Sequence, residues 1–152
     1  MFRTTIGAAA AAVIVASASG AASAKPSGGE AAVRALEAQF AAAVSAKDVD
    51  AIIKVYSPDV FVYDVVPPRQ YVGAAAYRRD WESFMGGFKG PVKFAISDLD
   101  VQVAGPVAWS HSVQHAVGVD PSGQPSDVTV RVTDVYRETP AGWRIVQEHV
   151  SV

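Results

Sequence analysis

The feature that most constrains the fold is a series of four alternating runs that fills the C-terminal part of the chain. Apolar and polar residues alternate over residues 92–104, 107–119, 127–138 and 142–151, and short turns containing Gly or Pro separate the runs. A period of two places successive side chains on opposite faces of a strand. Short turns join antiparallel neighbours. The sequence therefore predicts four consecutive antiparallel strands in one strongly curved sheet.

The residues before this sheet have mostly helical periodicity. One apolar stripe at spacings of three and four runs through residues 30–47. Asp48 is a candidate N-cap for a shorter helix over 49–57, a short strand follows at 60–64, and a third helix is expected over 74–85. The predicted order is α-α-β-α-β-β-β-β, which is an α+β class with helices covering one face of the sheet. A curved sheet closed by helices forms a cone, and the open end of a cone is a common place for a ligand.

The first residues have the pattern of an export signal. Arg3 precedes an apolar stretch rich in Ala, Val and Ile, and Ala22-Ser23-Ala24 matches a cleavage site. We expect a signal peptide at 1–24 with cleavage after Ala24, a flexible leader at 25–29, and one domain over 30–152. The apolar run is short and rich in Ala and Ser, so a membrane anchor is the less favoured interpretation. The expected location is periplasmic or secreted.

The amino-acid composition and the absence of known motifs exclude several classes of binding partner and of catalytic chemistry. The chain has no Cys, which excludes disulfides. After Ala24, 12 basic residues stand against 15 acidic ones without a basic run, so neither nucleic acid nor a membrane surface is an expected partner. Motifs for nucleotides, for metalloproteases and for the serine of α/β-hydrolases are absent from the sequence. We expect no cofactor, and a small molecule as the ligand.

Two aspartates are the first candidates for chemistry. Asp64 ends the strand at 60–64 with the same parity as Val60 and Val62, so it is either a general base at the mouth of a pocket or an ordinary strand-end carboxylate. Asp134 shares a face with Val132 and Tyr136, which predicts that it points inward with Tyr136. A buried carboxyl can stay protonated and donate a hydrogen bond to an oxyanion. The alternative is a structural pair with a neighbouring Arg.

The last strand adds His149, which has the parity of Trp143, Ile145 and Gln147. If that face is the core face, His149 is a candidate for proton transfer and Gln147 a candidate for ligand binding. A structural role for His149 is an equal alternative.

Aromatic and imidazole side chains complete the candidate set. Tyr71 and Trp81 are either pocket walls or ordinary core aromatics, and Tyr136 is a further candidate for ligand binding. His111 is a further candidate for ligand binding. His111 and His115 are four residues apart on one strand, about 13 Å at about 3.3 Å per residue, so we expect no metal site there.

The chain resembles the SnoaL-like group of the nuclear transport factor 2-like superfamily. The resemblance is carried by KDVDAIIKVYSPDVFVYD, YVGAAAYRRDWESF, AWSHS and RVTDVYRETPAGWRIVQEHVSV, and it covers about residues 30–152. The superfamily includes ketosteroid isomerases, polyketide cyclases and the association domain of calcium/calmodulin-dependent protein kinase II. The implied fold is the cone described above.

The resemblance also implies roles for particular residues. Asp64 matches the general-base Asp of ketosteroid isomerases, and Asp134 matches their oxyanion-hole Asp. Phe40 stands where those enzymes have a Tyr that donates to the oxyanion. The resemblance further implies a homodimer formed through the outer face of the sheet.

Three functions remain open at this point. The first is a cofactor-free isomerase or cyclase that moves a proton with a carboxylate. The second is a non-catalytic module that binds a small, largely apolar molecule. The third is a homodimeric assembly module with a vestigial pocket.

Overall fold

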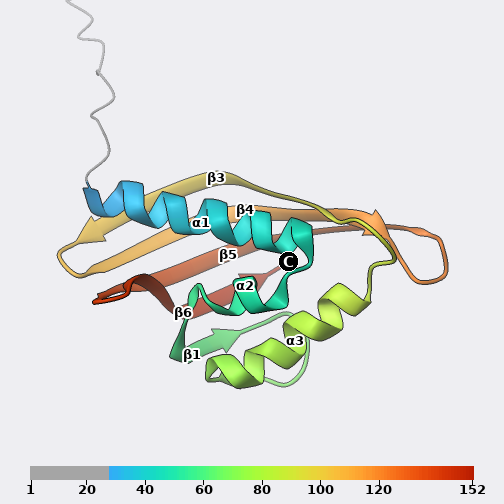
Figure 1. The fold of residues 1–152 in the computed structure, drawn as a ribbon, viewed down its shortest axis with the longest axis horizontal. Coiled ribbons are helices and arrows are strands. Elements are labelled where there is room, and N and C mark those ends of the chain that lie inside the picture. Colours follow the sequence, from blue (N-terminus) through green and yellow to red (C-terminus); the bar gives the residue numbers. More distant parts are fainter. Residues whose placement is uncertain (1–27) are drawn as a thin grey trace, which may run out of the picture.

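The computed structural model of the protein describes residues 28–152 (Figure 1). The expected signal peptide and residues 25–27 of the leader lie outside the described residues, and Gly28 and Gly29 belong to the first helix. The elements in chain order are α1 (Gly28–Ala46), α2 (Val49–Ile53), β1 (Tyr56–Tyr63), β2 (Tyr71–Val72), α3 (Ala74–Gly86), β3 (Lys93–Ala104), β4 (Val107–Val119), β5 (Pro125–Thr139) and β6 (Gly142–Ser151).

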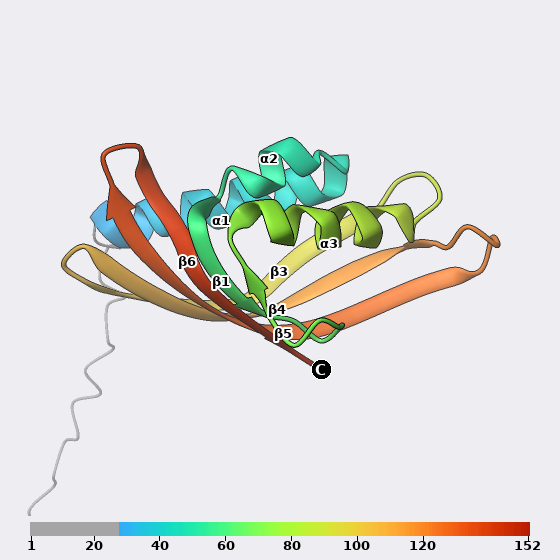
Figure 2. The same cartoon turned by 90° about the horizontal axis from the view of Figure 1, so that it is seen from below.

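The strands form one six-stranded sheet in the order β2-β1-β6-β5-β4-β3. Strands β3 to β6 are consecutive antiparallel neighbours, as the alternating runs predict, and β1 pairs in parallel with β6. Figure 2 shows the sheet strongly curved, with α1, α2 and α3 on its concave side. The predicted α+β class and cone-shaped architecture are therefore confirmed.

Two bulges change which residues face the helices. In β3 the pairing with β4 shifts between Ser97 and Asp100. Before the shift the even-numbered side chains Phe94 and Ile96 face the helices, and after it the odd-numbered Leu99 and Val101 do. In β6 Ile145 pairs with Tyr136, but Gln147 pairs with Val135, which leaves Val146 as one extra residue. An extra residue reverses the parity of every position after it.

The segment around Pro58 differs from the sequence prediction. The second helix ends at Ile53, and β1 begins at Tyr56 instead of residue 60. The amide of Ile145 donates to the carbonyl oxygen of Val55 at 2.9 Å, and Tyr56 pairs with Ile145. A partner 90 residues further along the chain thus extends the strand at the expense of the last helical turn.

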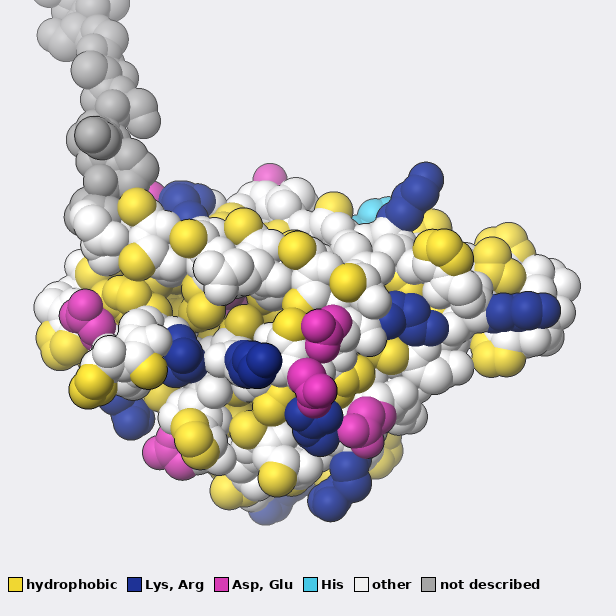
Figure 3. Space-filling view, viewed as in Figure 1, with side chains coloured by type: hydrophobic (Ala, Val, Ile, Leu, Met, Phe, Trp, Pro, Cys, Tyr) yellow, Lys and Arg dark blue, Asp and Glu magenta, His cyan; other side chains and the backbone are white. Residues whose placement is uncertain are grey.

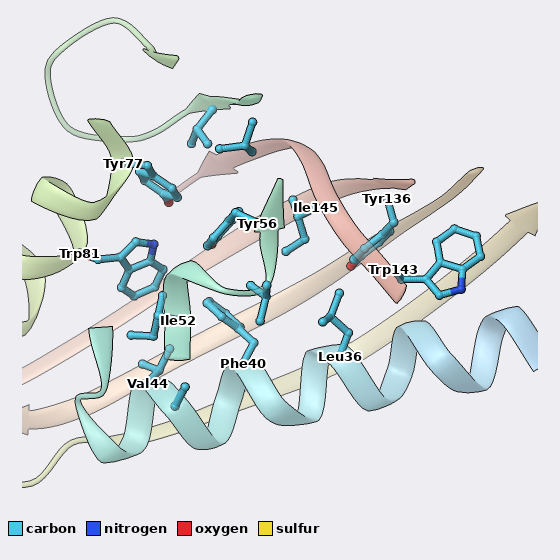
Figure 4. Close-up of a cluster of buried hydrophobic side chains, with 14 of the residues drawn as sticks. Leu36, Phe40, Val44, Ile52, Tyr56, Tyr77, Trp81, Tyr136, Trp143 and Ile145 are labelled. Carbon is cyan, nitrogen blue, oxygen red and sulfur yellow. The ribbon is translucent and has the colours of Figure 1, made fainter. Parts of the chain in front are cut away.

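The core lies between α1, α3 and the concave face of the sheet (Figure 4). Phe40 of α1 is 1% exposed and makes edge-to-face contacts with Tyr56, Trp81 and Phe94, at centroid distances of 6.3, 5.4 and 5.7 Å. Aromatic pairs in this geometry add to the free energy gained by burial alone. Phe40 therefore fixes the position of α1 against β1, α3 and β3.

The helix-bearing surface carries acidic and basic side chains intermingled with apolar ones (Figure 3). Arg78 of α3 illustrates the pattern, because it pairs with both Asp50 and Glu82. Within residues 28–152, no helix combines the length and the apolar character needed to cross a bilayer.

Candidate functional site

A cavity of about 420 Å³ lies between α3, the loop after β1 and the concave face of the sheet. Its aromatic wall consists of Tyr77, Trp81 and Phe84 of α3 and Phe94 of β3. Aliphatic side chains of β5 and β6 form the floor, including Val130 and Val150. The volume is within the range of small-molecule sites, and most of the lining is apolar.

Three carboxyl groups line this cavity, and the most buried of them is Glu148 of β6. Its side chain is 3% exposed. The Tyr77 hydroxyl donates to its Oε1 at 2.6 Å, and the Tyr56 hydroxyl donates to its Oε2 at 2.9 Å. Burial raises the pKa of Glu148 to about 7, although these two hydrogen bonds oppose the shift; the nearby carboxylates Asp64 and Glu37 raise the pKa further. A carboxyl with this pKa exchanges a proton near neutral pH.

Asp64 lies where β1 ends, at the mouth of the same cavity and half-buried. Its Oδ2 is 3.0 Å from the Tyr77 hydroxyl, which also contacts Glu148. A phenol has one proton and therefore donates to one carboxylate at a time. When Glu148 is protonated it can donate to the Tyr77 oxygen, and Tyr77 can then donate to Asp64. Tyr77 thus connects the inner carboxyl to the outer one.

Asp134 lies behind Glu148 instead of lining the cavity. The two residues are directly paired between β5 and β6, and Asp134 is 1% exposed. Burial, the negative charges of Glu148 and Glu37, and a hydrogen bond with Glu148 all raise the pKa of Asp134 well above its usual range. Its Oδ1 has no donor among residues 28–152. Burial beside other carboxyls therefore favours the neutral, protonated form of Asp134.

A second buried group extends this network toward α1. The Tyr136 hydroxyl donates to Glu37 Oε1 at 2.7 Å and lies 2.7 Å from Ser110 Oγ and 3.5 Å from Asp134 Oδ2. Glu37 is 2% exposed, and burial raises its pKa against the hydrogen bond from Tyr136. Glu37 and Asp134 therefore both contact the Tyr136 hydroxyl, and Asp134 is the cross-strand neighbour of Glu148.

The orientation predicted for the end of β6 is wrong. His149 and Gln147 are exposed on the convex face, and Glu148 points inward, because the extra residue Val146 reverses the parity after Ile145. Neither His149 nor Gln147 lines the cavity.

His111 also lies on the outside of the sheet. It is exposed on β4, where it pairs with Thr133, whereas its neighbours Ser110 and Ser112 are buried. The prediction that His111 lines the pocket is therefore wrong, because His111 lies on the convex face of β4.

The three aromatic candidates for ligand binding, Trp81, Tyr71 and Tyr136, lie in different parts of the fold. Trp81 lines the cavity. Tyr71 is buried beside Tyr77 and donates to Asp80 at 2.8 Å, so it supports the cavity wall from behind. Tyr136 belongs to the deeper network described above.

Sequence reasoning missed Glu37 and Glu148 for different reasons. Glu37 is one helical turn from Val33 and from Phe40, so it lies within the apolar stripe of α1. This position indicates a buried carboxyl and can be recognised from the sequence. Glu148 is hidden by the bulge, which simple alternation cannot reveal. Among residues 28–152, no group of three His, Asp or Glu side chains is arranged to hold a metal ion.

Comparisons with known proteins agree with this architecture. The model of the SnoaL-like domain family matches residues 33–152. An NTF2-like protein of unknown function from Pseudomonas putida KT2440 is 31% identical, with 80% of this chain and 84% of that chain covered and a TM-score of 0.71. No protein among those with curated functions matches the sequence.

Two further solved structures share the fold at lower identity. One is a ketosteroid isomerase-like protein from Erwinia carotovora atroseptica SCRI1043, at 18% identity, 80% and 93% coverage and a TM-score of 0.67. The other is an NTF2-like protein with a cystatin-like fold from Novosphingobium aromaticivorans, at 19% identity, 82% and 81% coverage and a TM-score of 0.67. At these identities the likeness concerns the fold alone.

Proposed function

The chain belongs to the SnoaL-like domain family, and we propose that its cavity binds a small, largely apolar molecule and that Glu148 moves a proton on it. The observation that carries the proposal is a buried carboxyl with a pKa of about 7 at an apolar cavity. A proton-transfer catalyst works best when its pKa is close to the operating pH. The reaction class is isomerisation or cyclisation next to a carbonyl, without a cofactor.

In this mechanism the Glu148 carboxylate removes a proton from the carbon next to the carbonyl. The protonated Glu148 then returns it to another atom of the same molecule, or passes it through Tyr77 toward Asp64 at the mouth. Apolar walls favour the step, because they exclude water that would otherwise stabilise the carboxylate. The base proposed from the structure is therefore Glu148, with Asp64 as the outer proton acceptor.

The structure supports a different role for Asp134 from the one that the family resemblance implies. Because Asp134 does not line the cavity and is the direct cross-strand neighbour of Glu148, it is placed to act on Glu148 instead of on an oxyanion of the ligand. We assign Asp134 as a positioning residue that keeps a proton beside Glu148.

Deuterium exchange tests the proposal with a generic probe. 2-Tetralone is an uncharged two-ring ketone with exchangeable protons next to its carbonyl. NMR in deuterated buffer at pH 7.5 measures the exchange rate above that of buffer alone. We expect wild-type protein to accelerate exchange and Glu148→Gln to lose the acceleration by a factor of about 100 or more, as for removal of a general base.

His149→Gln is the matched control, because it changes the next residue of the same strand on the opposite face. It should exchange deuterium at the wild-type rate. Equal rates for wild type and Glu148→Gln, or loss of rate in His149→Gln alone, would refute Glu148 as the base.

A non-catalytic binding module is the second candidate. Phe40 favours it, because this side chain has no hydroxyl to donate to an oxyanion and is packed among aromatic rings. Binding of 2-tetralone without any acceleration of exchange would identify this function.

We also propose the homodimer and the export that the sequence suggests. Val107, Trp109 and Tyr63 are between 41% and 45% exposed on strands of the sheet, where a second copy could cover them. Mass spectrometry of the protein from its native host tests export, and the expected N-terminus is Lys25.

A further inference from the structure

We propose that Gln114 binds an uncharged oxygen acceptor on the ligand, remote from the end on which Glu148 acts. This inference rests on the proposed function and specifies its ligand: a neutral molecule with a second acceptor group, such as an ether, ketone or hydroxyl oxygen, at the far end of an apolar skeleton.

Gln114 is a buried amide with an unused donor. It lies on the concave face of β4, lines the cavity and is 6% exposed. Its Nε2 has no hydrogen-bond partner within residues 28–152. The neighbouring lining residues Ala116, Val128 and Val130 have no side-chain acceptor. A buried donor without a partner costs about 1–3 kcal/mol, so an acceptor on a ligand would regain this free energy.

Trp81 presents a second unused donor in the same lining. The residue is 7% exposed, and its Nε1 has no acceptor in the part of the chain that the structure describes. An indole N–H can only donate. Figure 4 shows Trp81 at the edge of the aromatic cluster near Tyr77, whose ring centroid is 6.0 Å away. Both unused groups are donors, so the ligand has to supply an acceptor.

The charge of the lining restricts that acceptor to a neutral one. Asp64, Asp80 and Glu148 line the cavity, and none of the described lining residues is Lys, Arg or His. A carboxylate or phosphate on the ligand would meet three acidic groups and no counter-charge in a site of low polarity. Anionic ligands are therefore disfavoured.

The register of the sheet separates the two ends of the ligand. Ser110, Asp134 and Glu148 pair across β4, β5 and β6 in one row, and Gln114 follows Ser110 by four residues. At about 3.3 Å per residue, the backbone of Gln114 is about 13 Å along β4 from that row. The side chains of Gln114 and Glu148 extend over part of this distance. The ligand group that Gln114 hydrogen-bonds is therefore a different group from the carbonyl next to Glu148.

Three 2-tetralones that differ only at carbon 6 test the inference. The 6-methoxy compound carries a neutral acceptor, the 6-ethyl compound has similar size without one, and the 6-carboxylate is anionic. Calorimetry measures Kd for wild type, for Gln114→Met, which keeps the size but removes the donor, and for Ser112→Ala. Ser112 is buried on the same face of β4 and does not line the cavity, so it is the matched control.

We expect wild type to bind the methoxy compound about tenfold more tightly than the ethyl compound, the effect of one hydrogen bond. Gln114→Met should remove this preference, while Ser112→Ala keeps it. The carboxylate should bind most weakly to all three proteins.

The inference is overturned if Gln114→Met retains the methoxy preference, or if the carboxylate binds wild type best. Either result leaves the proposed function intact when the tetralones bind and 2-tetralone exchange still depends on Glu148. If none of the three compounds binds wild type and 2-tetralone exchange is not accelerated, both proposals fail.

Discussion

Replacing Glu148 by Gln should change how the stability of the protein depends on pH. Glu148 is buried with a pKa of about 7, compared with 4.5 for the ordinary side chain. A raised pKa means that the folded state binds the proton more tightly than the unfolded state. The contribution of Glu148 to stability is therefore full below about pH 4.5 and is lost as the pH rises through about 7.

The magnitude follows from the size of the pKa shift. One pKa unit corresponds to about 1.4 kcal/mol, so the shift of Glu148 corresponds to about 3 kcal/mol. The amide in the Glu148→Gln variant cannot ionise but has nearly the same shape, and its oxygen can still accept a hydrogen bond from Tyr56 or Tyr77. We expect the free energy of unfolding of the wild type to fall relative to that of Glu148→Gln by about 3 kcal/mol between pH 4.5 and pH 8.

Urea denaturation followed by tryptophan fluorescence at several pH values measures this difference. The difference in free energy of unfolding between the two proteins at any one pH depends on the hydrogen bonds that the introduced amide makes. The change of this difference with pH depends on the ionisation of Glu148. For Asp134→Asn, the difference from wild type should change with pH in the same direction, because burial also raises the pKa of Asp134. Parallel curves for wild type and Glu148→Gln across the whole range would refute the buried, neutral-pH carboxyl.

Two further predictions concern the core and the convex face. Phe40→Ala should lower the free energy of unfolding by about 3–5 kcal/mol, because it removes a ring that is 1% exposed and packs against three others; a loss below about 1 kcal/mol in urea denaturation would contradict this packing. Trp109→Arg, at a residue that is 45% exposed on β4, should convert the proposed homodimer to a monomer in light scattering, while Trp109→Phe keeps the dimer; a dimer that survives Trp109→Arg would place the interface elsewhere.

Local sequence patterns were sufficient for most of the fold. The four alternating runs predicted β3 to β6 and their antiparallel order, and the apolar stripe predicted α1. These predictions succeed because periodicity of side chains and turn chemistry are properties of neighbouring residues. The same reasoning placed the start of β1 four residues late, because the partner that extends it lies in β6.

The candidate site depended much more on tertiary structure. The alternation of side chains in β5 correctly predicted that Asp134 points to the concave face. Asp64 lies at the mouth of the cavity. The same alternation predicted the wrong face for His149 and Gln147. The extra residue Val146 turns both side chains to the convex face and turns Glu148 to the concave face. Alternation also gave no sign of which face of β4 is concave, so His111 was assigned to the wrong side.

The sequence by itself determined the α+β class, the order of elements apart from the short strand β2, and the SnoaL-like family, because these follow from short-range patterns repeated over the whole chain. Tertiary structure alone decided that Glu148 lines the cavity and how far its pKa is raised. Both depend on a single extra residue in β6 and on the desolvation produced by α1, α3 and β5 packing around Glu148. Burial is a property of the assembled fold, so the ionisation on which the proposed chemistry depends is set there.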